Sequence, residues 1–196
     1  MMETTASNNP AQQSSTSIAI KWALINVLAQ IIIIYGAQLL GLDFNSPVKT
    51  IAYIPMIACM LLTQKEYRIQ LKGYLSFNQG FSSGFKYAVF CGLMLGVFIY
   101  LYTAVLSPDY FARSIEAAQA KLAEKGLSGD QIDKAMEIQK KWGPIIGAFG
   151  VAIGYAIIGA IIALIGAAIF KKEKSPLEIA EELDEANTAQ NPDPTV

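Results

Sequence analysis

The sequence predicts an all-α integral membrane protein with four transmembrane helices and an extracytoplasmic helical hairpin between the third and the fourth. Three observations support this class. Only 16% of the 196 residues are charged and 53% are hydrophobic, whereas soluble domains carry about 25% charged residues. Three stretches are apolar over the roughly 20 residues that span hydrocarbon, and a shorter one lies between the first two. Basic clusters beside them fall on one side only if there are four spans.

The composition argues against several classes of function. With a net charge of −1, the chain has no excess of basic residues with which to bind nucleic acid. Histidine, the commonest acid–base group and metal ligand, is absent. Cys59 and Cys91 lie inside apolar stretches, where cysteine packs as a small apolar residue. We therefore expect no enzyme, no catalytic residue, no cofactor, no metal site and no nucleic-acid partner.

Residues 1–17 are rich in Ser, Thr, Asn and Gln, so we expect a disordered tail. They lack the basic n-region of a secretory signal, and the apolar run that follows is too long for a signal core, so it is interpreted as an uncleaved anchor. The first span is predicted at about 22–42, with Lys21 and Trp22 as interfacial anchors. This span contains three amide side chains, those of Asn26, Gln30 and Gln38. Such amides usually hydrogen-bond to a neighbouring helix; a polar substrate path is the alternative.

The second span, at about 48–63, is the shortest prediction, and Pro55 should kink it. A re-entrant segment is the alternative. The basic residues decide between the two. Those at 65–72 follow this stretch and those at 171–174 follow the last one, and only four spans place both clusters and Lys21 on one side. That side is then the cytoplasm, with both termini in it.

The third span, at about 86–106, carries regularly spaced small residues. Within it, Ala88–Leu106 is 19 residues without a charge. Small residues recur every four positions along one stripe of the helix, at Gly80, Gly84, Ala88, Gly92 and Gly96. Such a stripe lets a second helix approach closely, although glycine is also common in transmembrane helices in general. We interpret the four glycines as helix-packing residues.

Residues 107–143 are predicted to form the hairpin, outside the cytoplasm. Ser107 and Pro108 are an N-cap and first helical residue, and Gly126 suits a left-handed helix end. Ser128 and Gln131 form a capping box for the second helix. The first helix carries an apolar strip of Phe111, Ile115, Ala118 and Leu122, and the second one of Ile132, Ala135, Met136 and Trp142. We expect the strips to cover each other because the turn is short; a membrane surface or a partner is the alternative.

The fourth span is predicted at 144–170, over 27 uncharged residues. It carries two faces of small residues, one of alanines and one of glycines. We expect Gly147, Gly150 and Gly154 to pack against the third span. Residues 173–196 should form a short acidic helix, from the Ser175–Pro176 start to about Ala186, and a disordered end. The membrane domain is therefore 18–172, between two tails.

Three motifs read in order support a family assignment: FNQGFSSGF at Phe77–Phe85, SPDYF at Ser107–Phe111 and KAMEIQKKWGP at Lys134–Pro144. With these spans the chain resembles the bacterial membrane family called domain of unknown function 4199, which is found mainly in Bacteroidota. The likeness covers roughly residues 18–172, and the acidic tail falls outside it. The resemblance implies an inner-membrane protein with a helical extracytoplasmic insert, and it implies no reaction or ligand.

The leading functional hypothesis is a non-enzymatic, multi-pass inner-membrane protein that acts through helix packing, as an oligomer or an accessory envelope subunit. Besides the lipid bilayer, its partner is a second copy or another envelope protein. The alternative is a small transporter or channel component, supported by Asn26, Gln30, Gln38 and the break at Pro55. No Asp or Glu lies within a predicted span, which excludes an intramembrane carboxylate relay. An envelope lipid enzyme is the least favoured class.

Overall fold

The computed structural model describes residues 14–40 and 48–190, and most of them are helical. The elements in chain order are α1 (Ser15–Leu39), α2 (Val48–Gln70), α3 (Phe77–Leu101), a π-helical turn η1 (Tyr102–Leu106), α4 (Pro108–Glu124), α5 (Gly129–Phe170) and α6 (Pro176–Gln190). The described part of the chain contains no strand. Its one extended contact is an antiparallel bridge between Leu75 and Lys172, which joins the start of α3 to the end of α5.

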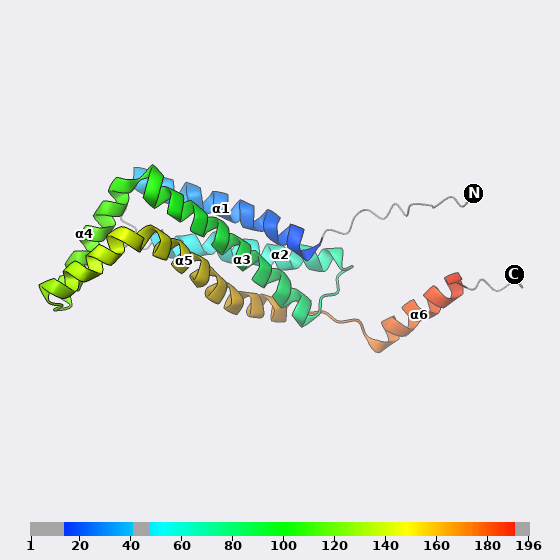
Figure 1. Ribbon diagram of the computed structural model, residues 1–196. Helices are drawn as coiled ribbons and strands as arrows, with labels where there is room; N and C mark the ends of the chain where they lie inside the picture. The colour runs from blue at the N-terminus through cyan, green and yellow to red at the C-terminus, as the bar shows by residue number, and fades with distance from the viewer. Residues whose placement is uncertain (1–13, 41–47, 191–196) are drawn as a thin grey trace, which may run out of the picture.

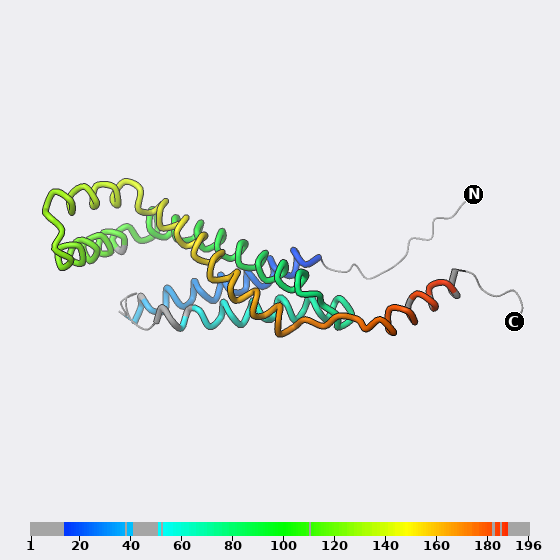
Figure 2. Tube along the Cα trace, turned by 90° about the horizontal axis from the view of Figure 1, so that it is seen from below, coloured from blue at the N-terminus to red at the C-terminus, as the bar shows by residue number. Residues whose placement is uncertain are grey.

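Four long helices, α1, α2, α3 and α5, run up and down beside one another as a bundle (Figure 1). The largest helix–helix contact joins α3 to α5, and α2 packs against α1, α3 and α5. The helix α4 and the first part of α5 extend beyond the bundle at one end, while α1 begins and α5 ends at the other (Figures 1 and 2). The chain is therefore an all-helical protein built on one bundle.

Within residues 14–40 and 48–190, three helices are long and apolar enough to cross a membrane: Ser15–Ala37, Phe77–Leu106 and Gly129–Phe170. The helix α2 is not among them, because its apolar run is interrupted early by Lys49 and late by Lys65. The predicted second span is thus a full-length helix of the bundle, but its composition is that of a shorter apolar segment. These lengths and compositions indicate a membrane protein.

The helices extend beyond the predicted membrane spans. The first helix begins at Ser15, inside the predicted tail of residues 1–17, and α3 begins at Phe77, nine residues before the span predicted at about 86–106. The second hairpin helix and the fourth span are one helix of 42 residues, with Pro144 inside it. A proline in a helix leaves the carbonyl of the residue four positions earlier without its bond. That residue is Lys140, which is exposed. Predictions for residues 1–13, 41–47 and 191–196 lie outside the described residues.

The helix ends follow the predicted chemistry with one exception. Reciprocal capping boxes are present at Ser128 with Gln131 and at Ser175 with Glu178, and Gly126 has a φ of +77°, the left-handed conformation that glycine adopts easily. Ser107 precedes Pro108 as predicted, but its side chain makes no capping hydrogen bond. Its backbone N–H donates instead to Tyr102, across the π-helical turn.

The apolar strip of α4 is covered by α5. Ile115, Ile132 and Met136 form a small core of their own, with 7%, 8% and 5% of their surfaces exposed. Phe111, Ala118, Leu122 and Ala135 pack around it. Trp142 does not belong to this core, because 49% of its surface is exposed on another side of α5. The two helix segments therefore support each other.

Replacing Ile115 with alanine should destabilise the α4–α5 segment by about 2 kcal/mol, because it removes buried methylenes and leaves a cavity. Ile138 on α5 is the matched control, since 57% of its surface is exposed and its replacement creates no cavity. Hydrogen exchange of α4 and residues 129–143 in detergent measures the effect. Equal protection in both variants would contradict the prediction.

Candidate functional site

The glycines of α3 lie against α5 and Gln64. A Cβ placed on Gly92 would lie 2.9 Å from the backbone oxygen of Ala152, and one on Gly96 would lie 2.8 Å from that of Ala148. Gly80 faces Ala167 in the same way, and Gly84 faces Ala163 and Gln64. The backbones of α3 and α5 are therefore in direct contact over several turns, which only small residues permit.

The α5 side of this contact consists mainly of alanines: Ala148, Ala152, Ala163 and Ala167, together with Gly159 against Ala88. The prediction that Gly147, Gly150 and Gly154 meet the third span is wrong. Among the described residues, no atom lies within 4 Å of a Cβ built on any of them. Alanine and glycine stripes lie on different faces of one helix, and the alanine face is the one that contacts α3.

The glycine face of α5 instead borders an open cavity of about 360 Å³ beside α2. Gly147, Gly150 and Gly154 line it from α5, and Tyr53 and Met56 line it from α2. Gly147 also lines a second cavity of about 320 Å³ at the base of α4. This face of α5 is therefore left without close neighbours in the described part of the chain.

Buried polar groups meet at the centre of the bundle. The amide nitrogen of Asn26 donates to Cys91 Sγ at 2.8 Å, and the hydroxyl of Tyr87 donates to the carbonyl of Met56 at 3.1 Å. These bonds tie α1 to α3 and α3 to α2, as expected for an intramembrane amide. Asn26 Oδ1 is buried, and no hydrogen-bond partner is found for it among the described residues. Tyr155 of α5 interacts with Asn26 and also lines the α2–α5 cavity.

Of the other predicted amides, Gln30 is buried, with 4% of its surface exposed. The side chain of Gln38 lies outside the described residues. The sequence reasoning missed Gln64, a fully buried residue of α2. Its Nε2 donates to the carbonyls of Gly80 at 3.0 Å and Ala163 at 2.9 Å. Because Gln64 directly precedes Lys65, the pattern placed it at the membrane boundary rather than between two helices.

A carboxylate anchors α1 to α2 at the end of the bundle where α1 begins. Lys21 donates to both oxygens of Glu66, and Trp22 Nε1 donates to Glu66 Oε2 at 2.7 Å. Partial burial raises the pKa of Glu66, but these hydrogen bonds and the Lys21 charge outweigh it, so the pKa lies below its ordinary value. The pair helps hold the first two helices together.

Because the folded pKa of Glu66 is depressed, its contribution to stability is complete above the unfolded value of about 4.3 and is lost as pH falls through the folded pKa. The contribution should be no more than about 1 kcal/mol, since the pair is partly exposed. Glu66→Gln should reduce the loss of thermal stability on acidification. Glu173→Gln, whose pair with Lys171 is more exposed, is the control, and an equal change in both would contradict the prediction.

The start of α6 is fixed to the same end of the bundle. The Tyr74 hydroxyl donates to Glu178 Oε1 at 2.7 Å, and Lys172 and Lys174 lie 5.2 and 5.4 Å from the Tyr74 ring centre. Hydrogen bonds from the Ser175 backbone, then from Tyr74 and the Ser175 hydroxyl, lower the pKa of Glu178. The acidic helix thus begins beside a basic cluster.

These features define an all-helical protein with membrane-type helices, tightly packed small-residue faces and buried amides. The chain belongs to the family described as "Protein of unknown function (DUF4199)", which matches residues 21–172. No curated protein matches the chain, and no solved structure does.

Proposed function

We propose that the protein crosses the bacterial inner membrane four times, with both termini in the cytoplasm and α4 with residues 129–143 of α5 outside. The position of α2 supports a fourth span, because it packs along α1, α3 and α5 over 23 residues, close to the 25 of α1. The basic residues support the orientation. Lys21, near the start of α1, pairs with Glu66 of α2, and Lys65 and Arg68 flank Glu66 in the sequence. Lys171 and Lys172 follow the end of α5, which lies at the same end of the bundle as the start of α1 (Figure 1).

Cysteine labelling tests this topology. Ser128→Cys and Ser175→Cys should react with a membrane-impermeant maleimide from opposite sides of the membrane. The unmodified chain is the control, because Cys59 and Cys91 are both buried. Labelling of both new cysteines from the same side would contradict four spans.

Within this topology, the protein is a non-enzymatic helix-packing protein that acts through contacts with a second copy or an envelope subunit. The observation that carries this proposal is the division of α5 into two small-residue faces. The alanine face is already covered by α3, whereas no atom of the described residues lies within 4 Å of a Cβ built on Gly147, Gly150 or Gly154. These glycines border the open cavity beside α2, and a face of small residues accepts another helix at close distance.

We expect Gly150→Leu to shift the protein in nanodiscs from an oligomer or complex toward a monomer, because leucine blocks close approach on the open face. The folded monomer should keep its stability, since no atom of the described residues lies within 4 Å of a Cβ built on Gly150. Mass photometry and crosslinking in native membranes measure the two species. A wild-type protein that is monomeric and recovers no partner after crosslinking would contradict the proposal.

A small transporter or channel component is the second candidate, supported by the buried amide cluster. Asn26 has an unpaired buried oxygen, and Tyr155 connects that cluster to the cavity between α2 and α5. Uptake of small polar solutes into proteoliposomes, abolished by Asn26→Leu, would favour this candidate. Absence of uptake in a panel that includes ions, amino acids and sugars would count against it.

A further inference from the structure

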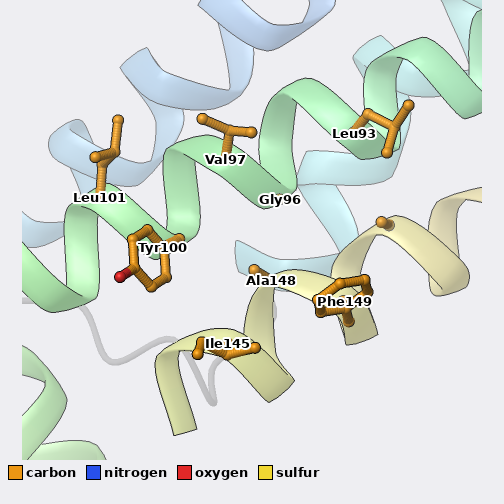
Figure 3. Close-up of a pocket in the computed structure, with 9 residues that line it drawn as sticks. Leu93, Gly96, Val97, Tyr100, Leu101, Ile145, Ala148 and Phe149 are labelled. Carbon is orange, nitrogen blue, oxygen red and sulfur yellow. The ribbon is translucent and has the colours of Figure 1, made fainter. Parts of the chain in front are cut away.

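A narrow apolar groove of about 300 Å³ runs between α3 and α5 (Figure 3). Gly96 and Ala148 form its floor, where the two backbones touch. Val97 and Phe149 form its rims, with 62% and 65% of their surfaces exposed. The groove thus follows from the packing contact: small residues that bring two helices together leave a furrow between the larger residues beside them.

The lining of the groove is almost entirely hydrocarbon. Its one side-chain polar atom is the hydroxyl of Tyr100, at the end nearer to η1. Since no other lining side chain can bind a polar solute, the occupant must be apolar along most of its length. The groove belongs to two helices that are both long and apolar enough to cross a membrane, so an alkyl chain of a lipid has direct access.

A cationic residue, Lys141, lies on α5 one helical turn beyond the lining residue Ile145. Ile145 lines the groove, and Lys141 and Trp142 precede it by four and three residues on the same helix, so they continue its stripe by one turn. The Lys141 Nζ lies 5.8 Å from the Trp142 ring centre, and both side chains are exposed. No salt bridge to Lys141 is found in residues 14–40 and 48–190. Tryptophan beside lysine is typical of the headgroup layer of a bilayer.

We infer that this groove binds one anionic phospholipid, with an acyl chain along Gly96 and Ala148 and the phosphate of the headgroup at Lys141. The groove matches such a lipid in two ways. Its apolar lining suits an acyl chain, and Lys141, for which no salt bridge is found among the described residues, suits the phosphate. The site lies on a different face of α5 from Gly147, Gly150 and Gly154. It therefore depends on neither the proposed oligomer nor the four-span topology.

Native mass spectrometry of the purified full chain tests the inference, with phosphatidylglycerol and phosphatidylcholine added in turn. The wild-type protein should retain one phosphatidylglycerol more strongly than phosphatidylcholine. Lys141→Gln should weaken phosphatidylglycerol binding about fivefold, the effect of one lysine near a charged membrane surface, and leave phosphatidylcholine unchanged. Lys125→Gln, at the exposed turn after α4, is the matched control and should change neither.

Val97→Trp fills the groove from its rim and should remove the retained lipid. Ile157→Trp is its control, because Ile157 has a similar exposed fraction, 59%, and does not line the groove. Equal retention in both tryptophan variants, or equal binding of the two lipids by the wild type, would overturn the inference. A wild-type oligomer that Val97→Trp alone converts to a monomer would also overturn it, since a second copy would then occupy the groove.

Discussion

Gly96→Leu should destabilise the folded chain by about 3 kcal/mol, at the upper end of the range for overpacking a close contact. A Cβ at this position would lie 2.8 Å from the backbone oxygen of Ala148, and real Cβ atoms essentially never come so close. The atom in the way belongs to the backbone of α5, so no side-chain rotation relieves the contact. The two helices must separate, and the contact that joins them is the largest in the bundle.

Gly150→Leu provides the matched control on the partner helix. A Cβ at Gly150 has no atom of the described residues within 4 Å, and the open cavity beside it has room for a larger side chain, so the substitution should leave the stability of the monomer unchanged. Unfolding of both variants in mild detergent, followed by circular dichroism, measures the difference. If Gly96→Leu unfolded at the same denaturant concentration as the wild type, α3 and α5 would not be in backbone contact.

The comparison of these two glycines shows how far the sequence could predict the packing. The stripe from Gly80 to Gly96 could be recognised because a four-residue spacing places its members on one side of a helix, whatever lies opposite. The face of the fourth span that contacts this stripe could not be predicted. The fourth span carries both an alanine and a glycine face, and a sequence pattern contains no information on which of them is turned toward a distant segment.

The same limit applies to the helix boundaries. Pro144 indicates a helix start by its local chemistry, since proline favours the first helical position. In the structure the helix continues through it, because residues 129–143 pack against α4 and the following residues pack against α3, although the helix changes direction between the two parts (Figures 1 and 2). Local signals predict capping residues such as Ser128 and Gln131 well, but tertiary contacts decide whether a helix breaks.

The burial of Asn26 could be predicted from the sequence and that of Gln64 could not, for a related reason. Asn26 lies in the middle of an apolar run, so its burial and its need for a partner follow from the sequence alone. Gln64 lies at the end of such a run, where an amide can equally face water. Only the fold places Gly84 and Gly166 beside it, and these two glycines leave the space that the Gln64 side chain occupies.

Gln64→Ala should lower the stability of the bundle by about 3 kcal/mol, through a cavity and the loss of two hydrogen bonds. The side chain is fully buried and links α2 to Gly80 of α3 and Ala163 of α5. Removing it leaves a void where three helices meet and breaks a polar link from α2 to α5. The cavity should cost more stability than the loss of the two hydrogen bonds, because hydrogen bonds between membrane helices contribute only about 0.6 kcal/mol each on average.

Gln64→Met separates the two terms, since methionine has a similar length and no amide. It should cost less than about 1 kcal/mol, because it fills the space and removes Oε1, which is buried and for which no hydrogen-bond partner is found among the described residues. Gln119→Ala, at an exposed position of α4, controls for the loss of a glutamine and should be neutral. Unfolding in detergent ranks the three variants. If methionine were as damaging as alanine, the two hydrogen bonds rather than the packing would hold α2 in the bundle.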